Sequence, residues 1–186
     1  MSEKAKRERF ERLVLAHMDT AYSLACWLTR NEAQAEDAVQ EAYLRAYKFF
    51  DGFRGGDARP WLLGIVRNAC YTLLQRERAS AGLDEFNEEN HGEEAVAPGA
   101  VLSFPLNPET AVIESAEREL VQQYLRALPT EYREALILRE IHDCSYKEIA
   151  AIAEIPIGTV MSRLARGRRL LQRALSEHVR KKDTGT

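Results

Sequence analysis

Residues 81–108 form the longest stretch of this sequence without a repeating apolar pattern, and this stretch divides the chain. It contains three glycines and three prolines, residues that interrupt both helices and strands. Loops of about 30 residues are uncommon inside one compact domain. We therefore predict two small domains, residues 1–80 and 109–186, joined by a flexible acidic linker over residues 81–108.

Charge is distributed unevenly along the chain, although the net charge is only −3. Residues 81–118 carry nine acidic residues and one basic residue. In contrast, residues 1–80 carry 13 basic and 11 acidic residues, and residues 119–186 carry 12 basic and 9 acidic residues. The acidity thus comes from the middle of the chain, and both ends are mildly basic. A charged segment with few apolar anchors also predicts protease sensitivity there.

Several function classes are disfavoured by composition. Hydrophobic residues make up 45% of the chain and charged residues 30%, as in ordinary soluble proteins. The charged N-terminus does not resemble a signal peptide, and the longest nearly apolar run, residues 21–28, is too short to cross a bilayer. The three cysteines, Cys26, Cys70 and Cys144, include no CxxC pair. This pattern predicts reduced thiols and a cytoplasmic protein. His142 and Cys144 lack a second ligand pair, so we expect no metal and no cofactor.

The N-terminal half is predicted to contain helices over residues 10–30, 32–50 and 60–78. Asn31 and Gln34 have the spacing of a capping pair, and Pro60 suits the first turn of a helix. The second helix places an apolar face on Val39, Ala42, Tyr43, Ala46 and Phe50, and an outer side on Asp37, Gln40, Glu41, Leu44 and Lys48. The third is expected to bury Leu62, Ile65, Val66, Ala69 and Leu73, and to expose Arg67, Asn68 and Tyr71.

The C-terminal half is also predicted to be helical, with segments at residues 109–127, 131–141, 145–153 and from 158 onward. Ser145 and Glu148 form a full capping box. The last two helices are separated by a turn of about four residues, which is the spacing of a helix-turn-helix. Because no segment has a convincing strand pattern, the fold class is predicted to be all-α.

The last helix of this pair is strongly basic on one side. Val160 and Leu164 are expected to face inward, and no acidic residue lies between Ile155 and Ser176. In a major-groove reader, the second helix places polar residues on base edges and arginines on phosphates. A C-terminal amphipathic helix with basic residues near its end is the alternative interpretation, because the helix dipole favours that placement. The arginines at 163, 166, 168, 169 and 173 are too one-sided for that alternative, so we predict DNA contact.

Two blocks of sequence resemble one bacterial family. The run LPTEYREALILREIHDCSYKEIAAIAEIPIGTVMSRLARGRRLL is similar to the promoter-reading domain of the extracytoplasmic-function sigma factors of RNA polymerase. The run DAVQEAYLRAYKFFDGFRGGDARPWLLGIVRNACYTLLQRER is similar to the domain of that family that binds core polymerase and melts DNA. The resemblance covers about residues 10–78 and 108–176, in the family's order around a linker.

The resemblance implies roles for the N-terminal half. The clamp helices of the largest polymerase subunit would be contacted by Asp37, Gln40, Glu41 and Leu44. The glycine-containing loop at 51–59 and the helix after it would open the duplex and capture a base of the −10 element. The residues implied in that step are Phe53, Arg54, Trp61, Asn68, Tyr71 and Arg76. Stacking and hydrogen bonds must return the few kcal/mol that base extrusion costs. Phe53 and Trp61 fit the hydrophobic core equally well.

For the C-terminal half, the resemblance implies reading of the −35 element and contact with the polymerase flap. The implied DNA-binding residues are Ser145, Thr159, Met161, Ser162, Arg163, Ala165, Arg166 and Arg168. Some family members carry a basic residue at the position of Met161, whose thioether cannot make the bidentate guanine contact of an arginine. Family members are commonly controlled by an anti-sigma factor, and the same is expected here.

Two other functional classes were weighed against this interpretation. A helix-turn-helix repressor or activator that works without core polymerase would explain residues 145–169, but not the stripe of Asp37, Gln40 and Glu41. An enzyme would need a catalytic set, and no Ser/His/Asp arrangement, carboxylate pair or phosphate-binding loop is present in the sequence. We therefore expect a non-enzymatic initiation factor.

Overall fold

The computed structural model describes the backbone of residues 3–80 and 112–183, and the side chains of residues 3–80 and 118–180. The N-terminal half contains α1 (Glu3–Leu13), η1 (Leu15–His17), α2 (Met18–Thr29), α3 (Glu32–Phe49), η2 (Phe50–Gly52) and α4 (Ala58–Ser80). The C-terminal half contains α5 (Val112–Ala127), α6 (Thr130–Leu136), η3 (Ile137–Ile141), α7 (Tyr146–Ala153) and α8 (Ile157–Asp183). The described residues include no strand, which confirms the all-α prediction. The predicted linker, with its predicted flexibility and protease sensitivity, falls on residues outside the described ranges.

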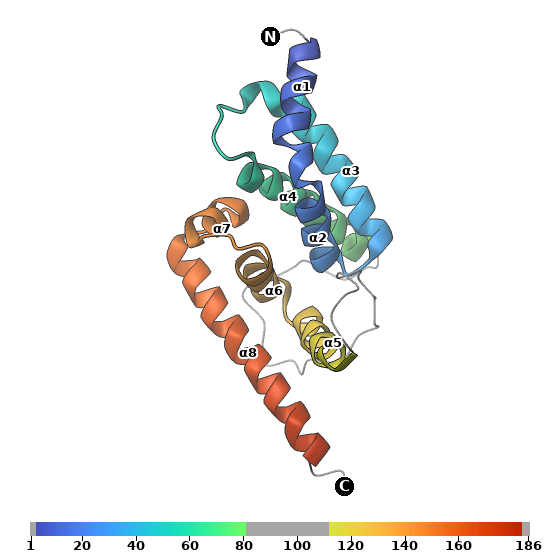
Figure 1. Ribbon diagram of the computed structural model, residues 1–186, viewed down its shortest axis with the longest axis vertical. Helices are drawn as coiled ribbons and strands as arrows, with labels where there is room; N and C mark the ends of the chain where they lie inside the picture. The colour runs from blue at the N-terminus through green and yellow to red at the C-terminus, as the bar shows by residue number, and fades with distance from the viewer. Residues whose placement is uncertain (1–2, 81–111, 184–186) are drawn as a thin grey trace.

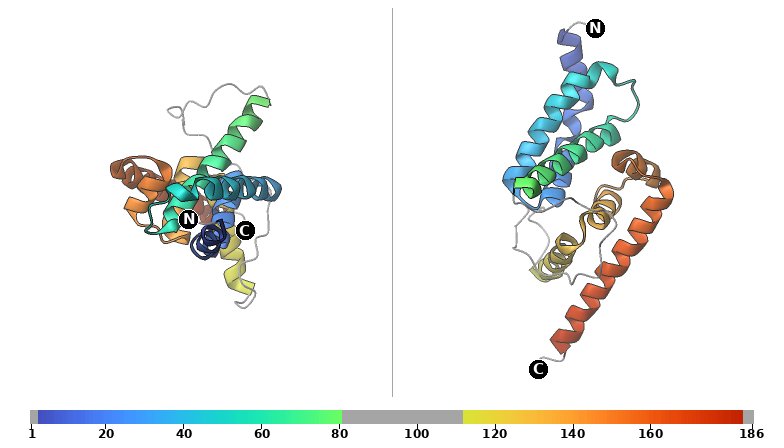
Figure 2. Two further views of the ribbon diagram at one scale, coloured as in Figure 1. Left: turned by 90° about the horizontal axis from the view of Figure 1, so that it is seen from above. Right: turned by 180° about the vertical axis from the view of Figure 1, so that it is seen from behind.

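The helices are arranged in two groups along the length of the molecule. In Figure 1, α1 to α4 form the upper group and α5 to α8 the lower group, with the long helix α8 running down one side to the C-terminal end. The view from behind in Figure 2 shows the same arrangement, with the start of α1 and the end of α8 far apart. None of the helices in the described ranges is both long and apolar enough to span a membrane.

Small residues and a side-chain cap shape the N-terminal group. The Asn31 side chain accepts a hydrogen bond from the backbone N–H of Gln34 at 3.1 Å, which confirms the predicted start of α3. Buried alanines along α3 let α2 and α4 pack closely against it: Ala35, Ala38, Ala42 and Ala46. Before α4, Gly55 and Gly56 adopt φ values of 90° and 89°, a region that side chains disfavour.

Two helix boundaries differ from the prediction. The helix expected over residues 10–30 is divided into α1, which starts earlier, and α2, with η1 between them. No glycine or proline marks this break. Phe10 of α1 packs edge-on against Tyr47 of α3 at 5.1 Å and against Phe50 of η2 at 5.2 Å, so α1 is anchored at the end of α3. Helix α4 begins at Ala58, where the Asp57 carboxylate accepts from the Arg59 N–H at 2.9 Å. Pro60 therefore lies within the first turn, where its missing N–H is tolerated.

The helix-turn-helix of the C-terminal group has the predicted local structure. Ser145 caps α7, and its capping box with Glu148 is complete. Glu154 ends α7 in the left-handed region at φ 56°. Gly167 of α8 sits against Leu136 of α6, and a Cβ added there would lie only 3.1 Å from that side chain. Any other residue at this position would require the Leu136 side chain to move by a few tenths of an ångström.

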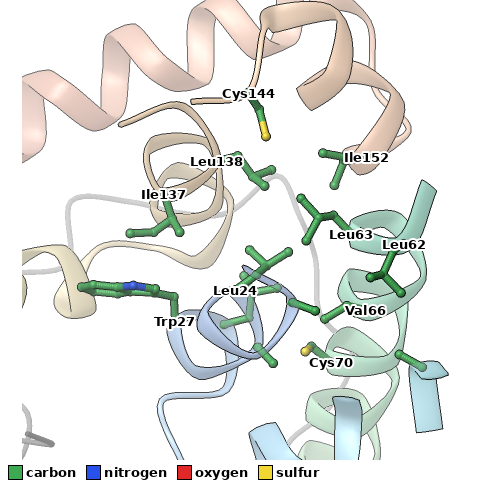
Figure 3. Close-up of a cluster of buried hydrophobic side chains, with 14 of the residues drawn as sticks. Leu24, Trp27, Leu62, Leu63, Val66, Cys70, Ile137, Leu138, Cys144 and Ile152 are labelled. Atoms are coloured by element: carbon green, nitrogen blue, oxygen red, sulfur yellow. The ribbon is translucent and has the colours of Figure 1, made fainter. Parts of the chain in front are cut away.

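The two groups share one hydrophobic core. Figure 3 shows buried side chains of both groups next to one another. The N-terminal group contributes Leu24 and Trp27 of α2 and Leu62, Leu63, Val66 and Cys70 of α4. The C-terminal group contributes Ile137 and Leu138 of η3, Cys144 just before α7 and Ile152 within α7. Helices α4 and α7 approach so closely that a Cβ on Gly64 would lie 3.9 Å from the Cα of Ile152. The sequence left the relative placement of the halves open, and the structure docks them.

Candidate nucleic-acid interface

Helix α8 divides its residues between the core and the surface. Val160 and Leu164 are buried, as predicted from their spacing. On the outer side the exposed residues are Met161, Ser162, Ala165, Arg166, Arg168 and Arg169, and Met161 is 55% exposed. Ser145 is exposed at the start of α7, and Thr159 is half-buried in the first turn of α8. The predicted reading residues of α8 therefore lie on its exposed or half-buried outer side, with Arg163 as the exception, and Ser145 lies at the start of α7.

The arginines of α8 differ in their surroundings. Arg168 contacts the Glu140 carboxylate through Nε and Nη2 at 3.2 and 2.7 Å. Arg166 lies over the ring of Tyr132, 5.8 Å from its centre. Arg163 was predicted on the outer face, but its side chain is only 17% exposed and lies 3.9 Å from the Glu134 carboxylate. The spacing of residues within α8 places Arg163 at the edge of the buried face, and the carboxylate of α6 draws it in.

The face of α4 that carries Arg67, Asn68 and Tyr71 is covered by the C-terminal group. Arg67 donates to the Glu134 carboxylate through Nε at 2.5 Å and Nη2 at 3.4 Å. The Tyr71 hydroxyl contacts the same carboxylate at 3.3 Å. Asn68 stays exposed and donates to Glu154 at 3.3 Å. The predicted exposure of Arg67 and Tyr71 was wrong, because docking of α6 and α7 onto α4 half-buries both side chains.

Glu134 is the electrostatic centre of this contact. It is 1% exposed and has no water-facing side, so its charge depends on the groups that surround it. Burial disfavours the charge of Arg67, but the facing Glu134 carboxylate outweighs this effect and raises the pKa of the guanidinium. Burial, together with the same carboxylate, raises the pKa of Tyr71 far above its ordinary value, so the phenol remains a proton donor. Burial raises the pKa of the Glu134 carboxyl, and the facing Arg67 guanidinium opposes this shift and favours the carboxylate. The cluster thus joins the Glu134 carboxyl to one guanidinium and one hydroxyl donor.

The loop before α4 is built on stacked aromatic rings. Phe53 is 9% exposed and stacks on Phe50 with ring centres 5.9 Å apart. Trp61 is half-buried with its ring centre 5.0 Å from that of Phe53. Of the two roles open to Phe53, the structure places it in the core. Arg54 is exposed in the loop, and Arg76 is exposed near the end of α4.

The stripe on α3 is exposed along its length, as predicted for this face. Asp37, Gln40 and Glu41 are all exposed, and Leu44 beside them is 64% exposed. Glu41 forms an exposed pair with Arg45 one turn later, at 2.7 Å. We call the residues Asp37, Gln40, Glu41 and Leu44 the α3 stripe.

Sequence reasoning missed Glu134 and Glu154 as partners of α4, and it assigned no role to Arg67. Glu134 lies in the predicted helix 131–141, and a charged pair, Arg133-Glu134, beside an apolar run was the one visible signal. Spacing within that helix could not identify a partner 67 positions away in the sequence. Within the part of the chain with described side chains, no three metal-ligating residues come together, and the three cysteines are buried free thiols.

Comparison with known proteins matches both halves to one family. Residues 13–80 match the model "Sigma-70 region 2", and residues 118–171 match "Sigma-70, region 4". The chain is 32% identical over 183 residues to the ECF RNA polymerase sigma-E factor of Escherichia coli K12, covering 96% of this chain and 93% of that protein. It is 31% identical over 176 residues to the ECF RNA polymerase sigma factor SigE of Mycolicibacterium smegmatis, covering 95% of this chain and 65% of that protein.

Solved structures show the same fold. The sigma factor RpoE of Bartonella quintana, in complex with the anti-sigma factor NepR, has a TM-score of 0.68 and 27% identity, covering 91% of this chain and 98% of that chain. CnrH in complex with the cytosolic domain of CnrY has a TM-score of 0.60 and 23% identity, covering 92% of this chain and 90% of that chain. At that identity the second likeness establishes the fold alone.

Proposed function

The chain belongs to the extracytoplasmic-function class of sigma-70 factors, the initiation factors of bacterial RNA polymerase, and we propose how its surfaces divide the steps of initiation. The α3 stripe binds core polymerase at the clamp helices of the largest subunit. The α4 face and the preceding loop contact the −10 element during melting, and the outer side of α8 reads the −35 element. A repressor or activator that works without polymerase is not favoured, because both halves match the sigma family.

The observation that carries the assignment is the contrast between two exposed helix faces. The outer side of α8 presents arginines and small polar residues without an acidic residue between positions 155 and 176. This charge suits a phosphate backbone, and the exposed Ser162 suits close approach to base edges. The α3 stripe combines carboxylates with the exposed Leu44, a mixture that suits a protein surface. The chain acts by binding, and the flap is the proposed polymerase contact of the C-terminal half.

Control by an anti-sigma factor is part of the proposal. The Bartonella sigma factor with a similar fold is described in complex with such a protein. Its likeness spans 91% of this chain, so both helical groups have counterparts in that complex. A protein that binds both groups would keep the polymerase-binding and DNA-binding faces from their targets.

The double substitution Asp37→Arg/Glu41→Arg tests the polymerase contact. Both side chains are exposed, so the free energy of unfolding should change by about 0.5 kcal/mol or less. Pull-down of core polymerase should nevertheless fall strongly, because reversed charges across an interface are disfavoured. Circular dichroism checks that the variant is folded.

The matched control is Glu8→Arg/Glu11→Arg on α1. These two residues are also exposed, and Glu11 forms an exposed pair with Arg7 at 2.8 Å that resembles the Glu41–Arg45 pair. The control should bind core polymerase like the unmodified protein. A folded Asp37→Arg/Glu41→Arg variant that binds polymerase undiminished would contradict the proposed contact.

A further inference from the structure

Helix α1 reaches the loop before α4 through an ion pair. Lys6 of α1 places its Nζ 2.7 Å from the carboxylate of Asp51, which lies in η2 at the start of that loop. The Lys6 side chain is 12% exposed, and its ammonium lies over the Tyr47 ring, 5.0 Å from the ring centre. The Tyr47 hydroxyl donates in turn to Glu3 at 2.5 Å. Figure 1 shows α1 and this loop at the same end of the molecule. The ammonium of Lys6 is thus held by α3 as well as by the loop.

A series of aromatic contacts continues from α1 to the inner side of the loop. Phe10 is 6% exposed and packs edge-on against Phe50, and the guanidinium of Arg9 lies 5.4 Å from the centre of the same ring. Phe50 stacks on Phe53 of the loop, and Phe53 contacts Trp61 of α4. Aromatic pairs of this kind stabilise a structure beyond the area they bury. Helix α1 therefore contacts both the exposed start of the loop and the buried rings beneath it.

The loop has two properties that make an outside support useful. Gly55 and Gly56 have φ values of 90° and 89°, and glycine loses more conformational freedom than any other residue when a loop is ordered. A loop that must be ordered during binding loses affinity, whereas one that is held beforehand does not. The Asp51 side chain is 63% exposed, and a carboxylate without a cation beside it would repel the phosphates of a DNA strand. A cation from α1 meets both needs.

We propose that Lys6 and Asp51 are positioning residues for the loop that captures the −10 base, so that α1 determines how strictly this base is selected. This inference rests on the proposed role of the loop in melting. Lys6 acts through the loop: it fixes the place of Asp51 and neutralises its charge. Lys6 and Phe10 precede residue 13, where the match to the region 2 model begins, so that match assigns them no role.

Removing the two members of the pair one at a time should change total affinity in opposite directions. Lys6→Met keeps the apolar stem but leaves the Asp51 carboxylate uncompensated, so single-strand binding should weaken about twofold. Asp51→Asn leaves the cation unpaired, so single-strand binding should strengthen about twofold. Both variants should nevertheless lower the preference for the selected base at least about threefold, because the loop is no longer fixed. A merely structural defect would not make binding tighter and less selective at once.

The assay uses the full chain bound to core polymerase and a random pool of single-stranded DNA of about 12 nucleotides. Sequencing of the bound strands gives the preference at the most strongly selected position, and fluorescence anisotropy of the labelled pool gives total binding. The exchanged pair Lys6→Glu/Asp51→Lys should restore the preference to within about twofold of the unmodified protein, because opposite charges again face each other. The matched control is Arg7→Met, which breaks the 2.8 Å pair of Arg7 with Glu11 on the same helix and should change neither quantity.

The outcomes separate the two proposals. If the unmodified protein selects no base, the melting role of the loop and the positioning role of Lys6 and Asp51 are overturned together. If the unmodified protein selects a base and both single variants select it equally well, only the positioning role is overturned. An exchanged pair that stays as unselective as the single variants overturns it too. Circular dichroism checks folding, and Asp51→Asn changes an exposed side chain, so it decides the question even if Lys6→Met does not fold.

Discussion

Two neighbouring residues of α6, Arg133 and Glu134, show how one helix turn can serve two partners. Arg133 is almost fully buried and donates to the carbonyl oxygens of Arg126, Leu128 and Leu28, so it joins the C-terminal ends of helices α5 and α2. Glu134 accepts from side chains of α4. Removing one member of a buried charged pair leaves the other uncompensated and typically costs about 3–5 kcal/mol. At the scale of residues, the docked state is thus held by charged side chains that have little access to water.

His142 should make the stability of the fold sensitive to acid. It is 9% exposed, and burial, followed by the nearby Arg59, lowers the pKa of its imidazole to about 4. The folded state therefore binds the proton less readily than the unfolded state, whose pKa is near 6.5. Stability is complete above pH 6.5 and falls as the pH drops towards 4; the free energy of unfolding should decrease by about 2 kcal/mol between pH 7.5 and pH 5.

Urea denaturation of the unmodified protein and of His142→Gln at the two pH values measures this effect. The variant lacks the titrating group and should lose about 2 kcal/mol less over the same interval. An identical pH dependence of the two proteins would contradict the assignment of the acid sensitivity to His142.

At the scale of elements, α8 combines three tasks along one continuous helix. Its first turns expose the proposed reading residues, Gly167 packs against α6, and its last turns meet α5, where Tyr124 and His178 lie 3.2 Å apart. A helix of 27 residues extends well beyond what a helix-turn-helix needs. Its length lets one rigid element hold the DNA-facing surface in a fixed position relative to both α5 and α6.

The arginines of α8 predict a salt dependence of promoter binding. Arg166→Ala and Arg168→Ala should each weaken binding of duplex promoter DNA and lower the slope of log K against log salt by about one unit if the lost contact is to phosphate. Fluorescence anisotropy over a salt series measures the slope. Arg7→Ala on α1, which also loses an exposed pair, is the control. If neither α8 variant differs from this control, the proposed DNA face of α8 is wrong.

At the scale of the whole molecule, the two helical groups pack against each other and share one hydrophobic core. The buried cluster runs from α2 and α4 through η3 to α7 (Figure 3). Leu138 and Ile152 are fully buried where the groups meet. Each half therefore contributes to the stability of the other.

Leu138→Ala should destabilise both halves together. Leucine-to-alanine changes in cores cost about 2–5 kcal/mol. Both tryptophans, Trp27 and Trp61, lie in the N-terminal half, so their fluorescence reports on the half that is not mutated. The denaturation midpoints from tryptophan fluorescence and from far-UV circular dichroism should fall together. A fluorescence midpoint that stays unchanged would show that the halves unfold independently.

Local sequence patterns determined the elements of this protein. The helical spacing of apolar residues predicted α3, α4, α7 and the inward face of α8, and Asn31 and Ser145 marked two helix starts, because capping and amphipathic packing depend on residues only a few positions apart. Two blocks of motifs indicated the family, and both were matched.

Only the tertiary structure decided how the halves meet. It divided the helix predicted over residues 10–30, placed Phe53 in the core, turned Arg163 inward and half-buried Arg67 and Tyr71. Each of these outcomes depends on a neighbour far away in the sequence: Arg67 is paired with a residue 67 positions later. Helical periodicity identifies which side of a helix is apolar, but a polar side chain at its edge becomes buried or exposed according to the surface that docks against it.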